Sequence, residues 1–421
     1  MPKSKYLIIL AILISLLPFG YIFTIASDYS QLQLAGSFWA YVGAVLLWWQ
    51  IILGTRQICR WANLDMVEAL NIHKWLGKYG TILILIHPII QIYRYTYTLS
   101  EAINWTFVPQ FGSQWQLFLN HGRLALVWLL IIYISSVILR SRLRYQPWLY
   151  IHYLAYVMVI NVFVHGYMGT MLNQIGWLKV LWSVAFLLYV GLVIYKLLVG
   201  SGTLATKYQI TNTTLDQTLL QLVLSPVSKP LGKPLGGQYL YLQLRAFGQG
   251  HPFSVLSYNE SNGDIQLSVR VIGDFTDRLS KLAVGAEVNL DGYYGHYTQN
   301  LDTSTPTLII AGGVGLAPFW SMINQHTANL SLIYCTSTIT DSLNLEPLKQ
   351  LLGERLSHHI GTTNRLKPTD IELVLNSITG GDQSQIQVYI CAGHNLTKMA
   401  KTELLKLGVT KTNIHIEDFG Y

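Results

Sequence analysis

Two apolar stretches, HKWLGKYGTILILIH (73–87) and HYLAYVMVINVFVH (152–165), each begin and end with a histidine. Both stretches lie within hydrophobic runs that are long enough to cross a lipid bilayer. Ionisable side chains at that depth are costly, and where they occur they mark functional sites by default. The two matched histidine pairs therefore predict a binding site inside a bundle of membrane-spanning helices.

The composition agrees with a large membrane part, because 51% of the 421 residues are hydrophobic and only 12% are charged. Six apolar segments reach the ~20 residues that a spanning helix needs. These segments are 6–27, 36–59, 73–97, 119–139, 148–170 and 175–198. Lys3 and Lys5 precede the first segment as in a signal peptide, but its length and the lack of an A-x-A site favour an uncleaved anchor.

The positive charge of the chain is concentrated in this membrane half. Residues 1–200 hold 13 Lys and Arg against 4 Asp and Glu, whereas residues 201–421 hold 15 against 17. The basic balance therefore predicts a lipid bilayer, and no nucleic acid, as the partner. Lys and Arg cluster before the first segment, between the second and third, and at 140–144 between the fourth and fifth. By the positive-inside rule, we expect a multi-pass protein of the plasma membrane with both termini and residues 201–421 in the cytoplasm.

The spacing of the histidines favours two haems stacked across the membrane. His73 and His87 are 14 residues apart, and His152 and His165 are 13 apart, which correspond to ~21 and ~20 Å along a helix. An inner pair, His73 and His152, and an outer pair, His87 and His165, can each hold a b-type haem iron through two axial imidazoles. The alternative is four buried histidines that hydrogen-bond to carbonyl groups.

Two details of this arrangement stay open. Thirteen residues of an ideal helix rotate His165 away from the face of His152, so we expect a tilt or local distortion, helped by Pro88 and Gly166 beside the outer pair. His121 and Arg123 lie at the outer end of the fourth segment, where either a contact to a haem propionate or acceptor, or a plain interfacial role, explains them.

After residue 200 the pattern changes to short alternating strands, such as YLYLQL (239–244), IQLSVRVI (265–272) and AEVNL (286–290). We expect an antiparallel β-barrel over 201–304, after the transmembrane domain of 1–200. From 305 to 421 the pattern predicts an α/β domain, with strands at 307–310, 330–335 and 387–391 and a helix at 318–326. The glycine-rich turn at 311–318 follows a strand and precedes a helix, which is the context of a pyrophosphate-binding loop.

Two stretches of the barrel contain side chains that suit a flavin. The loop that ends in His251, Pro252, Phe253 and Ser254 puts an aromatic ring beside a hydroxyl, which can pack on an isoalloxazine ring and bond its N5. Arg270 lies at a strand end, and Thr276 lies at the helix start after Gly273, where helix N-termini bind phosphate. A barrel turn or a helix cap explains each stretch equally well.

Together these pieces resemble the NADPH oxidase and ferric reductase superfamily, and among its members the prokaryotic NADPH oxidase-like proteins. The resemblance covers nearly the whole chain. Both histidine spacings match, HPFSVLS (251–257) and RVIGDFTDRL (270–279) are similar to the flavin motifs, and AGGVGLAP (311–318) is similar to the nucleotide loop. DGYYG (291–295) resembles the family's DGPYG, with Tyr293 in place of proline.

The resemblance implies FAD, two haems, and NADPH or NADH as the electron donor. It implies that Phe253 and Ser254 face the flavin and that its phosphates are held by His251, Arg270 and Thr276. Within the glycine-rich loop, the pyrophosphate would be cradled by Gly312, Gly313, Gly315 and Pro318. Two further residues take catalytic places near the nicotinamide and flavin: Cys391, in a Cys-Ala-Gly rather than Cys-Gly-Pro context, and Phe419, ahead of Tyr421 as the aromatic that stacks on the flavin.

Nucleotide choice leans mildly to NADPH, with Arg365 and Lys367 for the 2′-phosphate, although Thr336-Ser337-Thr338 stands where NADPH-preferring relatives often have an arginine. The expected activity is an NAD(P)H oxidase that reduces oxygen to superoxide on the opposite face and needs no obligatory activator subunit. A ferric or cupric reductase, or an electron-delivery reductase, would use the same FAD–haem chain with a metal ion or a partner as acceptor. A non-enzymatic haem sensor is the third alternative.

Overall fold

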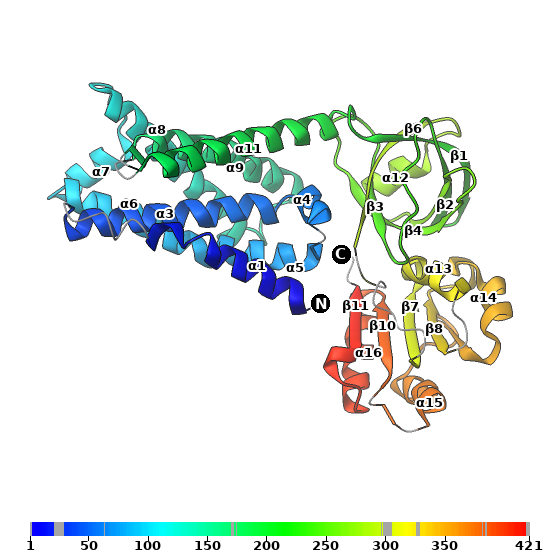
Figure 1. Cartoon of the computed structure of the whole chain (residues 1–421). Coiled ribbons are helices and arrows are strands. Elements are labelled where there is room, and N and C mark those ends of the chain that lie inside the picture. Colours follow the sequence, from blue (N-terminus) through cyan, green and yellow to red (C-terminus); the bar gives the residue numbers. More distant parts are fainter. Residues whose placement is uncertain are drawn as a thin grey trace. The chain divides into compact units, whose positions relative to one another are not determined.

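The structure, a computed structural model, divides the chain into two compact units, Met1–Lys196 and Leu197–Tyr421 (Figure 1). It describes residues 2–20, 29–62, 64–169, 172–173, 175–295, 297, 305–325, 329–380, 382–383 and 385–417. The first unit is built of helices and the second of a β-barrel followed by an α/β sheet. We expected the fold order of ferredoxin reductases, in which a β-barrel is followed by an α/β domain, and the described residues confirm this order.

Five helices of the first unit are long and apolar enough to cross a membrane. They comprise α3 (Gln31–Leu53), the joined run of α5 (Met66–Trp75), η1 (Leu76–Gly80) and α6 (Thr81–Tyr95), then α8 (Gln114–Tyr133) with η2 (Ile134–Ile138), α9 (Tyr145–Tyr167) and α11 (Gly176–Gly200). The segment expected at 6–27 forms a shorter apolar helix over Lys5–Gly20, which overlaps α1 (Pro2–Ile14). Residues 21–27 of this segment lie outside the described residues. Short helices α4 (Arg56–Trp61) and α7 (Leu99–Phe107) complete the unit.

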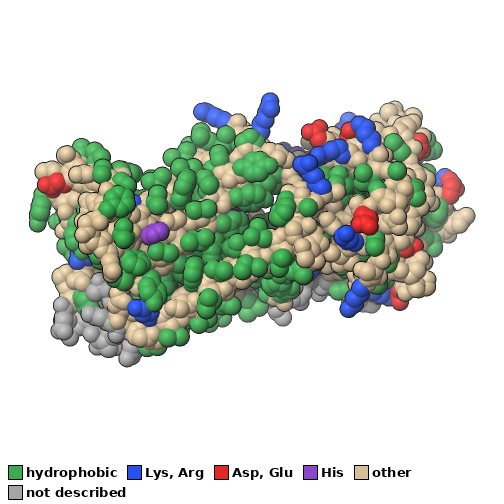
Figure 2. Space-filling view, turned by 90° about the horizontal axis from the view of Figure 1, so that it is seen from above, with side chains coloured by type: hydrophobic (Ala, Val, Ile, Leu, Met, Phe, Trp, Pro, Cys, Tyr) green, Lys and Arg blue, Asp and Glu red, His purple; other side chains and the backbone are tan. Residues whose placement is uncertain are grey.

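The helices pack as neighbouring pairs and keep apolar side chains on their outer surface. α3 packs on α6, and α8 packs on α9. Along α11, Val180, Val184 and Leu187 recur on one face and are all exposed. Hydrophobic side chains also dominate the face of this unit seen in Figure 2. A soluble protein rarely exposes such a continuous apolar surface, so this face is suited to lipid.

The barrel of the second unit is a closed sheet with the strand order β1-β2-β5-β4-β3-β6, all antiparallel. Its core alternates along the strands, as in Leu220, Leu222 and Leu224 of β2, which are buried while the residues between them are less so. The strands are β1 (Thr206–Asp216), β2 (Leu219–Pro226), β3 (Tyr239–Gln243), β4 (His251–Tyr258), β5 (Ile265–Arg270) and β6 (Glu287–Tyr294), with α12 (Asp274–Ser280) after β5. His251–Ser254, expected in the loop before a strand, instead opens β4 itself.

The α/β part has five parallel strands in the order β11-β10-β7-β8-β9. Apolar clusters lie on both faces of this sheet, one beneath α13 and α14 and the other beneath α15 and α16. The strands are β7 (Thr307–Gly312), β8 (Leu330–Thr336), β9 (Leu356–Ile360), β10 (Gln387–Cys391) and β11 (Ile414–Glu417); the helices are α13 (Ala317–Gln325), α14 (Leu345–Leu352), α15 (Pro368–Thr379) and α16 (His394–Lys406). The strand order reverses between β7 and β10, and ligands of such sheets bind in the crevice at that point.

We predict that Leu222→Ala destabilises the barrel by about 2–5 kcal/mol, because Leu222 is 1% exposed and its truncation leaves a cavity in a closed core. Leu215→Ala, at a side chain that is 54% exposed, serves as the control and should change stability by less than about 0.5 kcal/mol. Protease susceptibility of residues 201–421 in increasing urea measures both effects. Equal losses in the two variants would contradict the described core.

Candidate functional site

The four intramembrane histidines meet as two pairs, as the spacing predicted. His73 of α5 and His152 of α9 have ring centroids 6.1 Å apart, and His87 of α6 and His165 of α9 have centroids 6.3 Å apart. Two imidazoles on one metal, each with a bond of ~2.0 Å from nitrogen to metal and roughly 1.1 Å from nitrogen to ring centre, have centroids ~6.2 Å apart. Both separations fit one iron held between each pair.

The other ring nitrogen of each histidine has a protein partner. Nδ1 lies 2.9 Å from the Gln50 carbonyl in His73, 2.9 Å from the Gly36 carbonyl in His87 and 3.1 Å from the Phe118 carbonyl in His165. Because a carbonyl can only accept, Nδ1 carries the hydrogen in these three rings and Nε2 keeps its lone pair. This is the tautomer that a metal-ligating histidine needs, with its ring oriented by the second bond. In His152, Nδ1 lies 3.1 Å from the Ser136 hydroxyl instead.

A π-helical turn, rather than a distortion beside the outer pair, brings the two helices into phase. η1 lies between His73 and His87, whereas α9 runs unbroken from Tyr145 to Tyr167 through both of its histidines. A π-turn holds about one residue more than an α-turn, so 14 residues through η1 rotate about as far as 13 residues of regular α-helix. The irregularity expected near Pro88 and Gly166 is therefore found earlier, on the other helix.

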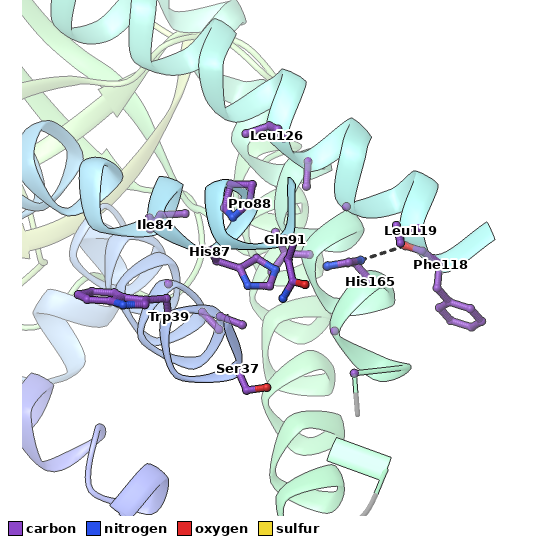
Figure 3. A pocket seen from close by; sticks show the side chains of 18 of the residues that line it. Ser37, Trp39, Ile84, His87, Pro88, Gln91, Phe118, Leu119, Leu126 and His165 are labelled. Atoms are coloured by element: carbon purple, nitrogen blue, oxygen red, sulfur yellow. Dashed lines mark hydrogen bonds between the residues drawn. The ribbon is translucent and has the colours of Figure 1, made fainter. Parts of the chain in front are cut away.

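The outer pair lines a cavity of about 320 Å³ in the first unit. Figure 3 shows His87 and His165 pointing toward each other, with Gln91 beside them and Trp39, Ile84 and Leu126 around the space. Glycine makes this approach possible, since a Cβ on Gly122 of α8 would lie 2.7 Å from the His165 ring. At the inner pair, a Cβ on Gly54 would lie 3.1 Å from the His73 ring. The helices thus leave their histidines room that larger residues would fill.

The polar residues at the outer end of α8 are tied to protein groups. Arg123 is buried; its Nε donates to the Trp105 carbonyl at 2.6 Å and its Nη1 donates to Asn120 Oδ1 at 2.6 Å. His121 Nδ1 lies 2.8 Å from Asn161 Oδ1. Arg123 also lines the outer cavity. Among the residues described, no group of three or more His, Cys, Asp and Glu is arranged to hold a metal ion.

In the barrel, two of the predicted flavin residues converge on an aromatic that was not singled out. His251 stacks on Phe275 with centroids 3.9 Å apart, and Phe253 lies 6.0 Å from the same ring. Burial, and then the Arg278 guanidinium, lower the pKa of His251, which favours the neutral ring. Pro252 and Ser254 lie beside them in β4, paired with Tyr241 and Tyr239 of β3. Phe275 belongs to the quoted RVIGDFTDRL stretch, so the signal that could have identified it was present.

The second flavin stretch is divided between two roles. Thr276 caps its own helix, since its Oγ1 accepts from the backbone N–H groups of Ile272 and Gly273 at 3.1 Å each and donates to the Gly273 carbonyl. Arg270, at the end of β5, points to the α/β part, where its Nη2 lies 3.9 Å from Asp341 Oδ2. Arg270 and Asp341 both line a pocket that includes Gly312 and Gly313 of the predicted nucleotide loop. The sequence did not identify Asp341 as a residue of this pocket.

The nucleotide pocket, about 460 Å³, lies at the carboxyl ends of β7, β8 and β10. Gly312, Gly313 and Arg365 line it together with Ser337, Asp341 and Gly393. Gly313 has φ +53°, and a Cβ on Gly315 would clash with the Cys391 carbonyl, so glycine is required where the turn after β7 approaches the end of β10. Pro318 and Cys391 are both buried. Phe419 and Tyr421 lie outside the described residues.

Two family models match this chain. Residues 39–163 match a ferric reductase like transmembrane component, and residues 206–317 match an FAD-binding domain. The first match covers the spans Met66–Tyr95 and Gln114–Ile138, most of α3 and most of α9, and it includes His73, His87 and His152. His165 lies two residues beyond its end. The second match covers the barrel and the glycine-rich loop as far as residue 317.

Several proteins are similar to part of this chain. Sulfhydrogenase 2 subunit gamma of Pyrococcus furiosus is 26% identical over 203 residues, which cover 43% of this chain and 70% of that protein. Flavohemoprotein B of Dictyostelium discoideum is 29% identical over 155 residues, which cover 34% of this chain and 37% of its own length. The phthalate dioxygenase reductase structure is 17% identical and covers 52% of this chain and 70% of that one, with a TM-score of 0.44, which is too low to decide a fold.

The fold and the matches define a multi-pass oxidoreductase with a ferric-reductase-like transmembrane domain and a flavin-binding domain in one chain. This combination is the domain architecture of the NADPH oxidase and ferric reductase superfamily.

We predict that Gly122→Ala selectively weakens the outer site. The new Cβ would lie 2.7 Å from an imidazole that is held by the Phe118 carbonyl, so the ring or the helix must move. The haem content of the purified protein should fall by up to one per chain. Gly191→Ala in α11 is the control, because nothing lies within 4 Å of its Cβ, and it should keep the wild-type haem content. Equal haem loss in both variants would contradict this account.

Proposed function

We propose that the chain is a transmembrane NAD(P)H oxidase that reduces oxygen to superoxide on the face opposite its nucleotide site. The observation that carries this proposal is the presence of two histidine pairs in the same chain as an FAD-binding domain. The two ring centroids are 6.1 Å apart in the inner pair and 6.3 Å apart in the outer pair. When bound, FAD takes a hydride from NAD(P)H and releases single electrons, and the two haems carry these across the membrane.

The residues of the second unit bind and orient the donor. The loop from Gly312 to Gly315, at the switch point of the sheet, would hold the pyrophosphate of NAD(P)H, and Arg365 of the same pocket would bind the 2′-phosphate of NADPH, the preferred donor. Cys391 would lie near the nicotinamide, and Phe253 and Ser254 would face the flavin ring. His251, stacked on Phe275, and Arg270 would hold the FAD phosphates.

The two histidine pairs of the first unit would each hold one haem iron. Because His73, His87, His152 and His165 each use Nδ1 for a protein hydrogen bond, Nε2 of each would be free to bind the iron. With two histidines on each iron, oxygen would be reduced at the outer cavity beside His87 and His165 without binding the metal. The Lys and Arg distribution supports a plasma-membrane protein with the inner pair and the flavin half on the cytoplasmic side.

Replacing a ligand of the outer pair tests the ligand set. His87→Ala and His165→Ala should each remove one haem per chain and stop transfer to an external acceptor, because a single imidazole cannot complete the site. His121→Ala is the matched control, since its ring is bonded to Asn161, and it should keep both haems. The haem-to-protein ratio and the reduced-minus-oxidised spectrum measure the outcome. Unchanged haem content in the two outer variants would refute the assignment.

The acceptor is tested by cytochrome c reduction with the detergent-purified, FAD-loaded protein and NADPH in air. We expect superoxide dismutase to inhibit this reduction strongly, because the electrons reach cytochrome c through oxygen. Boiled dismutase is the control. Turnover that dismutase does not affect would favour a ferric or cupric reductase, or an electron-delivery reductase, over the oxidase.

A further inference from the structure

One of the four intramembrane histidines is held differently from the others. His73, His87 and His165 donate from Nδ1 to a backbone carbonyl, at 2.9, 2.9 and 3.1 Å. His152 instead has the side-chain hydroxyl of Ser136 at 3.1 Å from its Nδ1. If Nε2 of His152 faces the iron, Nδ1 carries the hydrogen and the Ser136 oxygen is the acceptor.

The Ser136 oxygen has a second donor. The indole Nε1–H of Trp148 donates to it at 3.1 Å, and the Trp148 ring lies 5.2 Å from the His152 ring. The guanidinium carbon of Arg140 lies 4.4 Å from the centre of the same indole. His152, Ser136, Trp148 and Arg140 thus form a connected series from the inner site to the arginine-rich connection before α9.

The strength of the bond at Nδ1 controls how much electron density an axial imidazole gives to its metal. A peptide carbonyl is a strong acceptor, whereas a hydroxyl oxygen that already accepts from an indole N–H has less negative charge to offer a second donor. The ring of His152 is therefore the least polarised of the four. Hydrogen bonding around axial ligands is one of the means by which proteins set haem potentials.

We propose that Ser136 is a positioning residue that sets the reduction potential of the inner site, and that Trp148 moderates it through the shared oxygen. This proposal rests on the proposed function, because it requires a haem between His73 and His152. The Ser136 hydroxyl holds the ring of His152 and lowers the potential, while the Trp148 N–H weakens this effect.

The test is redox potentiometry of the purified holoprotein, in which the inner signal is the one that survives His87→Ala. Ser136→Ala should raise the midpoint potential of the inner haem and leave that of the outer haem unchanged, because the polarising acceptor is lost. Trp148→Phe should shift the inner potential in the opposite direction, since the competing donor is removed and the aromatic ring is kept. Ser136→Thr retains the hydroxyl and should restore the wild-type value.

Ser135→Ala is the matched control. Ser135 is the neighbouring serine of η2, it is buried, and its hydroxyl donates to the Ile132 carbonyl rather than to a histidine. This variant should leave both potentials unchanged. The low-spin ferric electron paramagnetic resonance signal of the inner haem should change in Ser136→Ala and not in Ser135→Ala.

The outcomes separate this proposal from the proposed function. A wild-type protein without two bis-histidine haems defeats the proposed function before any variant is compared. Two intact haems whose potentials do not move in Ser136→Ala and Trp148→Phe overturn the role of Ser136 and leave the proposed function standing. A shift in Ser135→Ala as large as that in Ser136→Ala also overturns it. If Ser136→Ala loses the inner haem, the Trp148→Phe variant decides. A lower inner potential in Trp148→Phe supports the proposal, and an unchanged or higher potential overturns it.

Discussion

A histidine inside an apolar bundle must satisfy two ring nitrogens, and the first unit is arranged around this constraint. An unpaired polar atom costs several kcal/mol in hydrocarbon surroundings, so each Nδ1 needs a protein partner. The partners come from other helices: Gln50 and Gly36 lie in α3 and Phe118 lies in α8. The bonds that satisfy the rings therefore also join the helices, and the packing of α3 on α6 and of α8 on α9 puts those carbonyls within reach.

The sequence predicted the histidine pairs because their spacing is periodic, but it did not predict what holds them. The π-turn at η1 compensates a one-residue difference between 73–87 and 152–165, and no residue type in LGKYG marks such a turn. Nδ1 partners are contacts between residues 16 to 51 positions apart, which no local pattern reveals. The close approach of Gly122 in α8 to the His165 ring in α9 likewise becomes visible only when the two helices are packed together.

In the second unit, alternation and turn residues predicted the strand positions well, since β5, β7, β8 and β10 start where expected. The start of β4 was missed, because HPFS was assigned to a loop, whereas these four residues pair with residues 239–242 of β3. Pairwise contacts across the barrel and sheet were also missed. Asp341 follows β8 but belongs to no recognisable sequence motif. Phe275 lies in the stretch 270–279, from which only Arg270 and Thr276 were selected as flavin-binding residues.

The contact between Arg270 and Asp341 changes the interpretation of the second unit. Arg270 belongs to the barrel and Asp341 to η4 (Ile339–Asp341), which follows β8, and both line the same pocket. The cation that was predicted for the FAD phosphates therefore lies in the pocket of the glycine-rich loop. Thr218 of the barrel also donates to Asp341, at 3.3 Å. Tyr297 donates to the carbonyls of Ile390 and His415, beside Cys391. Because Arg270 and Thr218 of the barrel both contact Asp341, the barrel and the α/β part are joined into one packed unit.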